Sequence, residues 1–330
     1  MAYLPFADVN INLITIFLAG LTVGILKGTF GTLANIVIVP VLNIFGLPLS
    51  ISVSTSAGYS FGRSSLSLFN NNPEWPALRR VGMVAGIAGL PGVFLGFKIH
   101  MLTMETFLGS KLLLLIYFTL LLFAVIALIR QWSFFNRHHY YDDAPFPAFG
   151  LGWRFPLAVP GGSGLKHITL CRVALTGFLL GTATGFLGLG AGILGVPLFM
   201  YILGIPQRNA LPTDTVSMLL ISSGTFLCYT AVGQVELAPV IILIVAVGLG
   251  NGIGALMPGE INLGHARLAF AILLGAIALS TAASINSLIS SRIILYVAGS
   301  SLFVILIVFS LIPDIILTLE KRVARHKNTL

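Results

Sequence analysis

The chain has 330 residues, of which 57% are hydrophobic and only 8% are charged. Soluble proteins carry about 25% charged residues, so this composition excludes a soluble protein and indicates a polytopic membrane protein. The formal net charge of +8 comes mostly from Lys and Arg in loops and in the C-terminal tail. Basic residues there set the orientation of membrane helices, so no nucleic-acid partner is predicted.

Apolar stretches follow one another along the chain, and most have lengths that suit membrane-spanning helices of about 20 residues. In the first part they cover residues 10–30, 32–46, 49–70, 77–99 and 106–130. After a polar central segment they resume at residues 169–188, 190–204, 209–232, 237–257, 264–288 and 292–318. The second and seventh of these stretches are short, so we predict that each is one half of a broken helical hairpin.

The stretch from Thr176 to Pro206 has too many glycines for an ordinary spanning helix and is too apolar for a soluble loop. Gly177, Gly181 and Gly185 fall four residues apart on one helical face, which favours close packing of one helix backbone on another. Further glycines and Pro197 follow, so we expect two short helices joined by a break. Unpaired backbone groups at such a break must be buried in protein or line a polar cavity, and this favours a transport site.

An internal repeat relates the two parts of the chain. When the two parts are aligned, glycines, both prolines of the hairpins and a serine pair coincide in the same order. The matched pairs are Gly20 with Gly177, Gly24 with Gly181, Gly28 with Gly185, Gly31 with Gly188, Pro40 with Pro197, Gly46 with Gly204, Pro48 with Pro206, Thr55 with Thr213, Ser64 with Ser222, Ser65 with Ser223, Gly92 with Gly250 and Gly96 with Gly254. An ordered series of this kind predicts two homologous halves.

Basic residues predict how these halves are oriented. Lys and Arg flank the central segment and crowd the C-terminal tail, so both should be cytoplasmic. Counting spans outward then places the hairpin tips, Gly46–Pro48 and Gly204–Pro206, on opposite sides of the membrane. The predicted fold is therefore an all-α polytopic membrane protein with two inverted-topology repeats. Each repeat has a glycine-broken helical hairpin followed by spanning helices.

The predicted repeats cover residues 9–131 and 169–288, and a cytoplasmic connecting loop at 132–168 joins them. Residues 289–330 are expected to form an extra C-terminal transmembrane helix and a basic cytoplasmic tail. The sequence HHYYDD in the connecting loop could suggest a metal site. Its surroundings are typical of a solvated connector, so neither a metal nor a cofactor is predicted.

Two basic residues fall inside predicted spans, where ionisable groups are costly and indicate function. Lys27 lies beside the break of the first hairpin and would place a cation next to the free amides of a half-helix, which suits an anion. The alternative is a lysine that extends to the lipid headgroups. Arg63 offers a planar set of donors that suits sulfonate, sulfite or carboxylate oxygens. Its alternatives are an ion pair with Asp214 or extension toward the headgroups.

Asp214 stands opposite Ser56 in the repeat and is a candidate proton-coupling carboxylate. The triplet Pro212–Asp214 is also typical of a helix start, where Thr or Asp caps free amides, and we favour this second interpretation. Neutral donors complete the candidate site, although Ser and Thr in spans more often bond to their own backbone or to a neighbouring helix. These donors are Asn35, Ser54, Thr55, Thr213 and the backbone amides near Gly190 and Gly192.

Enzyme interpretations find little support in the sequence. No histidine is expected inside a span, HExxH is absent, and the spans contain no Ser-His pair and no paired carboxylates. An ATP-binding motif is also absent, which favours coupling to protons or to the gradient of the transported anion.

The segment GFLLGTATGFLGLGAGILGVPLFMYILGIPQRNALPTDTVS at 177–217, followed by the turn GQVE at Gly233–Glu236, resembles the sulfite-exporter TauE/SafE family of anion transporters. A weaker counterpart lies at 20–56, so the resemblance covers nearly the whole chain except the central loop and the tail. It implies a two-repeat, multi-pass protein of the plasma (inner) membrane that moves sulfite, sulfonates or related small anions. Two departures from the family pattern, Ala-Asn at 34–35 and Pro-Thr-Asp at 212–214, fall on the candidate site.

We therefore predict a secondary membrane transporter of small sulfur-containing or carboxylate anions, with its site between the two broken hairpins. The substrate-binding residues would be Lys27, Asn35, Ser54, Thr55, Arg63, Gly190, Gly192 and Thr213, with Asp214 as coupling residue or helix cap. Its partners would be the anion, the lipid bilayer and protons, and a homodimer is left open. The alternatives are a passive anion channel and a membrane scaffold or assembly protein that transports nothing.

Overall fold

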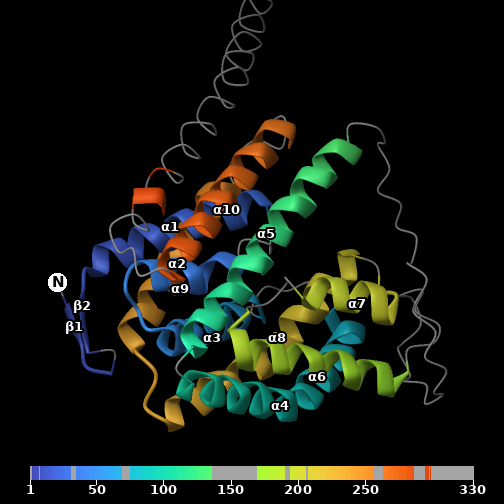
Figure 1. The fold of residues 1–330 in the computed structure, drawn as a ribbon. Coiled ribbons are helices and arrows are strands. Elements are labelled where there is room, and N and C mark those ends of the chain that lie inside the picture. The colour runs from blue at the N-terminus through green and yellow to red at the C-terminus, as the bar shows by residue number, and fades with distance from the viewer. Residues whose placement is uncertain are drawn as a thin grey trace, which may run out of the picture.

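The structure is a computed structural model that describes residues 2–6, 8–30, 35–68, 75–106, 108–135, 169–189, 194–205, 207–255, 263–285, 294–296 and 298. Within these ranges the chain is a bundle of helices with a small β-hairpin near the N-terminus (Figure 1). The hairpin pairs β1 (Ala2–Leu4) with the antiparallel β2 (Val9–Ile11). The helices are α1 (Leu13–Phe30), α2 (Ile38–Ile44), α3 (Leu49–Leu68), α4 (Trp75–Glu105), α5 (Gly109–Phe135), α6 (Leu170–Leu187), α7 (Gly195–Leu203), α8 (Gln207–Ala231), α9 (Leu237–Ala255) and α10 (Leu263–Ile285).

These helices follow the apolar stretches of the sequence, and the prediction of an all-α polytopic membrane fold is confirmed. Among the described residues, four helical segments are long and apolar enough to cross a membrane: Arg79–Glu105, Gly109–Ile126, Leu170–Leu187 and Leu237–Ala255. The β-hairpin was not predicted, because strands of three residues are too short to show the alternation that marks a strand. The predicted C-terminal helix and the connecting loop lie almost entirely outside the described residues.

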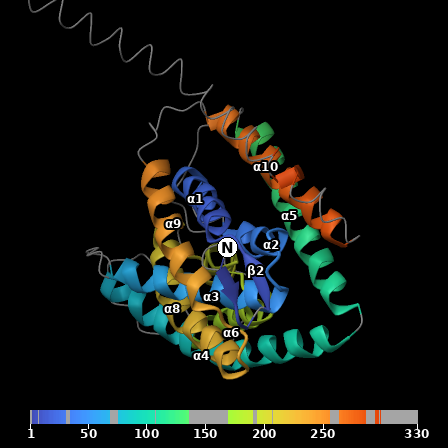
Figure 2. The same cartoon turned by 90° about the vertical axis from the view of Figure 1, so that its left-hand side faces the viewer.

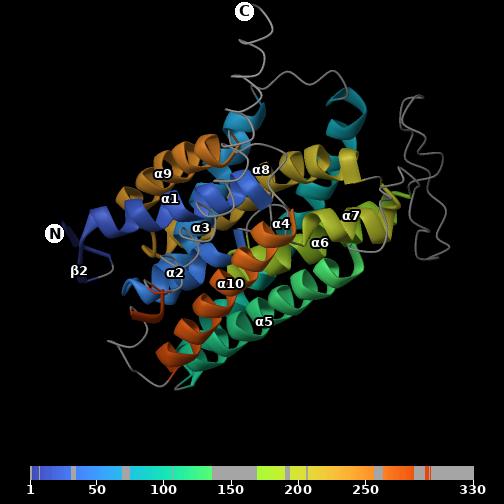
Figure 3. The ribbon, with the colours of Figure 1, turned by 90° about the horizontal axis from the view of Figure 1, so that it is seen from above.

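Most of the helix packing joins one half of the chain to the other. α1 packs on α9, α4 on α6, α3 on α8, and α5 on α10. The α1–α9 and α5–α10 pairs can be followed in Figures 2 and 3, and the α4–α6 pair in Figure 1. The sequence repeat matches α1 with α6 and α4 with α9. The α4–α6 pair is therefore the equivalent of the α1–α9 pair, with the contributions of the two halves interchanged.

Glycines allow the backbones of these two pairs to approach closely. A Cβ atom on Gly24 of α1 would lie 2.5 Å from the carbonyl oxygen of Val247 on α9, and one on Gly250 of α9 would collide with the carbonyl of Leu21 on α1. In the equivalent pair, Gly177, Gly181 and Gly185 of α6 meet the backbone of Ala85, Gly89 and Val93 on α4. The predicted backbone-to-backbone packing is confirmed, and the partner of each glycine series comes from the other half.

The short helices α2 and α7 are the second halves of the two broken hairpins. α6 ends at Leu187 and α7 begins at Gly195, as the glycine pattern predicted. Each short helix is followed by a glycine with positive φ, Gly46 at 99° and Gly204 at 69°. These glycines are matched in the repeat, and glycine adopts this conformation at no steric cost. The breaks themselves, at 31–34 and 190–193, lie outside the described residues.

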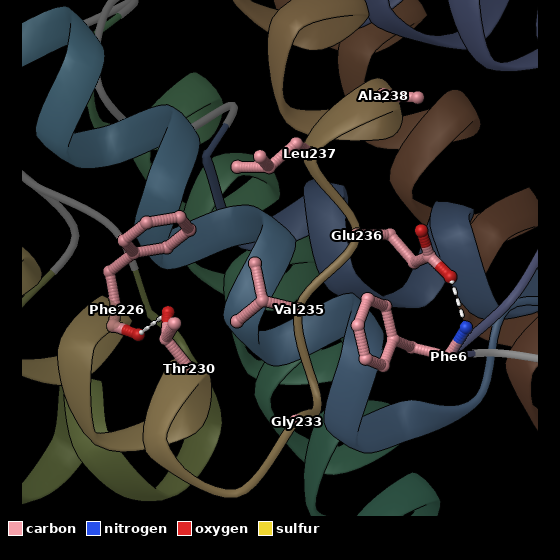
Figure 4. Close-up of a pocket in the computed structure, with 8 residues that line it drawn as sticks. All are labelled: Phe6, Phe226, Thr230, Gly233, Val235, Glu236, Leu237 and Ala238. Carbon is pink, nitrogen blue, oxygen red and sulfur yellow. Dashed lines mark hydrogen bonds between the residues drawn. The ribbon is translucent and has the colours of Figure 1, made fainter.

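The N-terminal β-hairpin is attached to the turn between α8 and α9. The backbone N–H of Phe6 donates to Oε1 of Glu236 at 2.6 Å, and Glu236 is 5% exposed. Figure 4 shows this contact beside a pocket of about 450 Å³. The pocket is lined by Phe6, Phe226, Thr230, Gly233, Val235, Glu236, Leu237 and Ala238. Part of the GQVE turn therefore holds the N-terminus against the helix bundle.

Candidate functional site

One half of α3 forms a buried polar face. Residues three and four positions apart share a face of a helix, and on α3 this spacing aligns Ser56, Tyr59, Ser60, Arg63 and Ser64. The tyrosine and the three serines are each no more than 2% exposed, and Arg63 is partly buried. This polar face is therefore turned into the protein.

Lys27 lies in the last turn of α1 and contacts this face. Its Nζ donates to the hydroxyl of Tyr59 at 2.7 Å and lies 5.3 Å from the centroid of the tyrosine ring. Because Tyr59 is buried, the ammonium group points into the helix bundle rather than away from it. Arg63 follows Tyr59 by one helical turn on the same face of α3. Two basic side chains, Lys27 and Arg63, therefore lie at this polar face.

Several polar atoms on α3 are buried without a hydrogen-bond partner in the part of the chain that the structure describes. They are Thr55 Oγ1, Ser60 Oγ, Arg63 Nη1 and Ser64 Oγ. Leaving a buried donor unpaired costs about 1–3 kcal/mol, and more for a charged group. Such groups are rare in native proteins unless water, an ion or a ligand satisfies them. Since Nη1 of Arg63 has no partner within the described residues, this nitrogen is not bonded to Asp214.

The polar face of α3 also contacts the break of the second hairpin. Ser56 Oγ donates to the carbonyl oxygen of Gly188 at 2.8 Å, directly after the end of α6. Gly188 has a φ of 59°, and its Cα lies against the backbone of Val53. The Tyr229 hydroxyl of α8 donates at 3.0 Å to the Gly185 carbonyl, which lies in the last turn of α6. Two helices therefore bind the carbonyl end of α6.

Two further donors complete this binding of the α6 end. The Tyr117 hydroxyl of α5 donates to the Leu187 carbonyl. On α4, Nδ1 of His100 lies 2.8 Å from the Phe186 carbonyl, and Nε2 lies 3.1 Å from Ser50 Oγ. Because a carbonyl accepts only, Nδ1 carries the proton and Nε2 of the neutral ring accepts from the serine.

The expectation that no histidine lies inside a span is wrong. α4 continues to Glu105, beyond the predicted end at residue 99, and His100 is 0% exposed. Its ring packs edge-to-face against Tyr229 at a centroid distance of 5.5 Å. His100 supports the end of α6 through its hydrogen bond to Phe186.

Asp214 lies inside α8 and is 1% exposed. α8 begins at Gln207 and includes Pro212, so the prediction that Pro212–Asp214 starts a helix is wrong. Proline inside a membrane helix is tolerated because neighbouring groups satisfy the freed backbone. The Asp214 carboxylate instead lies against Gly195, the first residue of α7, where a Cβ atom would collide with Oδ1. A helix N-terminus favours negative charge, so Asp214 can stabilise the start of α7.

The remaining predicted residues have three different outcomes. Ser54 and Thr213 donate to the carbonyls of Ile51 and Asn209 in their own helices, at 2.9 and 2.8 Å, as the alternative interpretation expected. Asn35 is 2% exposed in the turn before α2. Gly190 and Gly192 lie outside the described residues. Ser64, which was missed as a binding residue, could have been found from its helical spacing to Arg63.

These features define a class of protein: a multi-pass membrane protein with broken helical hairpins and a buried cationic site. The family model for the sulfite exporter TauE/SafE matches residues 16–281. The chain therefore belongs to this family, and it is a membrane protein of a family of anion transporters rather than of enzymes. The curated proteins and the solved structures that were compared include no match to the chain.

Proposed function

We propose that the protein is a secondary transporter that moves a small sulfur-containing or carboxylate anion across the plasma (inner) membrane, through a site between the two broken hairpins. The observation that carries the proposal is that two basic side chains come together at the buried polar face of α3: Lys27 donates to Tyr59, and Nη1 of Arg63 has no partner within the described residues. Positive charges on both side chains would disfavour each other in a medium of low dielectric constant. An anion bound beside them would relieve that repulsion.

The geometry favours an anion near the first hairpin rather than the second. At the second hairpin, the Asp214 carboxylate already lies at the start of α7, where an anion would otherwise bind. The repeat places Ser56 opposite Asp214, so the first half has a neutral hydroxyl at the equivalent position. We include Asp214 in the proposal as the residue that couples transport to protons, because protonation would remove its charge from the start of α7.

Two inverted-topology repeats, at residues 9–131 and 169–288, are part of the same proposal. The equivalence of the α1–α9 and α4–α6 pairs under the repeat supports this proposal. In transporters built in this way, the substrate site lies at the interface between the repeats. The polar face of α3 fits this description, since it contacts α1 through Lys27 and the end of α6 through Ser56.

The test is uptake of labelled sulfite into proteoliposomes that contain the purified full-length protein. We expect flux with the native protein and a large loss in both Lys27→Met and Arg63→Met. Ser65→Ala is the matched control on α3, because Ser65 is only partly buried and its hydroxyl already donates to the Phe61 carbonyl at 2.9 Å. Unchanged flux in both charge variants would contradict the site.

The same assay separates the alternative functions. A passive anion channel would give flux that follows the membrane potential and shows no dependence on a proton gradient. A scaffold or assembly protein would give no flux with sulfite, methanesulfonate or small dicarboxylates. Flux that depends on the proton gradient would support the proposed transporter.

A further inference from the structure

We infer that the pocket beside the N-terminal β-hairpin binds an acyl chain of a bilayer lipid, which enters from the lipid-facing side of α9. This site shares no residue with the proposed transport site and does not depend on the proposed function. Its volume of about 450 Å³ lies within the range of about 300–1,000 Å³ that is usual for small-ligand sites. In Figure 4 the rings of Phe6 and Phe226 lie on either side of Val235. The hairpin, the end of α8 and the turn before α9 thus enclose the pocket.

The lining of the pocket favours a hydrocarbon ligand, because its polar side chains are already engaged. The Thr230 hydroxyl donates to the Phe226 carbonyl at 2.7 Å, and the Glu236 carboxylate accepts from the Phe6 N–H at 2.6 Å. The other lining residues have apolar side chains or are glycine. A polar ligand atom buried here without a hydrogen bond would cost free energy, and the Glu236 carboxylate disfavours an anion. The pocket therefore suits an apolar chain.

The surface of α9 connects the pocket to the bilayer. Large apolar side chains that are 50–61% exposed recur along this helix at four-residue intervals: Leu237, Ile241, Val245 and Leu249. Residues four apart are neighbours on a helix surface, so these side chains form a continuous apolar stripe. The helix is long and apolar enough to cross a membrane, and Leu237, at the start of the stripe, also lines the pocket. An acyl chain that packs on this stripe can therefore continue into the pocket.

The β-hairpin has the side chains of a segment that lies among lipid head groups. Tyr3 and Phe6 are 59% and 62% exposed, and the Tyr3 hydroxyl donates to Asp8 at the surface. Aromatic rings with a polar tip are enriched at membrane–water interfaces. The head group of the lipid would stay beside the hairpin while its chain enters the pocket and contacts Phe6. The bound chain would then hold the hairpin on the bundle together with the hydrogen bond to Glu236.

The experiment measures the fluorescence of Phe6→Trp while a phosphatidylcholine with bromine atoms on one acyl chain is titrated into the purified full-length protein in detergent. The native protein gives the background from its own tryptophans, Trp75, Trp132 and Trp153. We expect a saturable loss of fluorescence, because bromine quenches indole at short range and the pocket is a single site. Tyr3→Trp is the control on the hairpin, since Tyr3 does not line the pocket. It should show weaker quenching that does not saturate.

Ala238→Phe and Val245→Phe, each combined with Phe6→Trp, form a matched pair on α9. Both positions are exposed and lie seven residues apart on one side of the helix, but only Ala238 lines the pocket. Ala238→Phe fills the pocket and should weaken lipid binding by about tenfold or more, which corresponds to lost contact with about two methylene groups. Val245→Phe should leave the quenching curve unchanged. Equal melting temperatures of the two variants without lipid would separate lost binding from lost folding.

Competitors identify the part of the lipid that is bound. Methyl oleate, which carries the chain without a charged head group, should reverse the quenching, and glycerophosphocholine, which carries the head group without chains, should not. Competition by glycerophosphocholine alone would overturn the acyl-chain assignment.

Two further results would overturn the site. Quenching of Phe6→Trp that does not saturate, or equal effects of Ala238→Phe and Val245→Phe, would mean that the pocket holds no lipid chain. Dissociation of a dimer by Ala238→Phe with unchanged quenching would instead assign the pocket to a second copy of this chain.

Discussion

Lys27 donates a hydrogen bond from Nζ to the hydroxyl of Tyr59 at 2.7 Å, and this contact joins the end of α1 to the buried polar face of α3. Lys27→Met keeps the length of the side chain and removes the charge. We expect it to lower sulfite uptake in proteoliposomes by about tenfold or more, since the loss of a charged partner to an anion costs at least about 1.5 kcal/mol.

Tyr59→Phe separates the charge of Lys27 from its position. The phenyl ring keeps the cation–π contact but not the hydroxyl that holds Nζ. We expect an intermediate loss of uptake, smaller than that of Lys27→Met. Equal losses of uptake in Tyr59→Phe and Lys27→Met would mean that uptake depends on the Tyr59 hydroxyl rather than on the charge of Lys27.

The close packing of α1 on α9 gives a prediction with a control in the same helix. A Cβ atom on Gly250 collides with the backbone of α1, whereas one on Gly252 meets nothing within 4 Å. Gly250→Ala should lower the melting temperature in detergent, since overpacking costs about 1–3 kcal/mol. Gly252→Ala should leave it unchanged or raise it, because alanine is the better helix former. The same response in both variants would contradict the packing.

The hydrogen bonds at the end of α6 should contribute to stability. Tyr229→Phe removes the donor to the Gly185 carbonyl and leaves that group buried without its side-chain partner. We expect the free energy of unfolding to fall by about 1–3 kcal/mol. Tyr3→Phe is the matched control, because Tyr3 is 59% exposed and its hydrogen bond to Asp8 is on the surface. A larger effect at Tyr3 would contradict this account.

Asp214→Asn tests the two roles left open for this carboxylate. The amide has nearly the same shape, but it does not carry the negative charge that favours the start of α7. Loss of that charge should lower stability by about 0.5–2 kcal/mol. If Asp214 also couples protons, the dependence of sulfite uptake on the proton gradient should disappear in the variant. Uptake that keeps its full proton dependence would reduce Asp214 to a structural residue.

Glu236→Gln addresses the attachment of the N-terminal hairpin. The hydrogen bond from Phe6 N ends on a charged oxygen at 2.6 Å, and a neutral amide oxygen accepts less strongly. We expect faster amide hydrogen exchange over β1 and β2 and little change elsewhere. Unchanged exchange in the hairpin would show that its apolar contacts alone hold it in place.

Much of the fold follows from local sequence patterns. Apolar length predicts the helices, and the four-residue glycine spacing of Gly177, Gly181 and Gly185 predicts close packing of backbones. The partner of that face was not predictable, because glycine spacing does not identify which helix lies opposite. The extent of α4 was also misjudged, since His100 looks like a loop residue until its partners on α3 and α6 are known.

The candidate site was predictable in its charges but not in its donors. Lys27 and Arg63 stand out because ionisable groups are rare in membrane spans. The hydroxyls are common in the sequence, and only the structure separates Ser54, which bonds to Ile51, from Ser60, which has no partner within the described residues. The position of the Asp214 carboxylate beside Gly195 depends on how α8 packs on α7, which local sequence does not specify.

The glycine-packed pairs bear on how such a molecule can change shape. α1 and α4 come from the first half of the chain, and their close partners α9 and α6 come from the second. If the two halves moved apart as rigid bodies, both backbone-to-backbone interfaces would have to open together. If the protein works by a rocking motion that exposes the proposed site to each side in turn, that motion would keep each pair intact. Each moving unit would then combine helices from both halves.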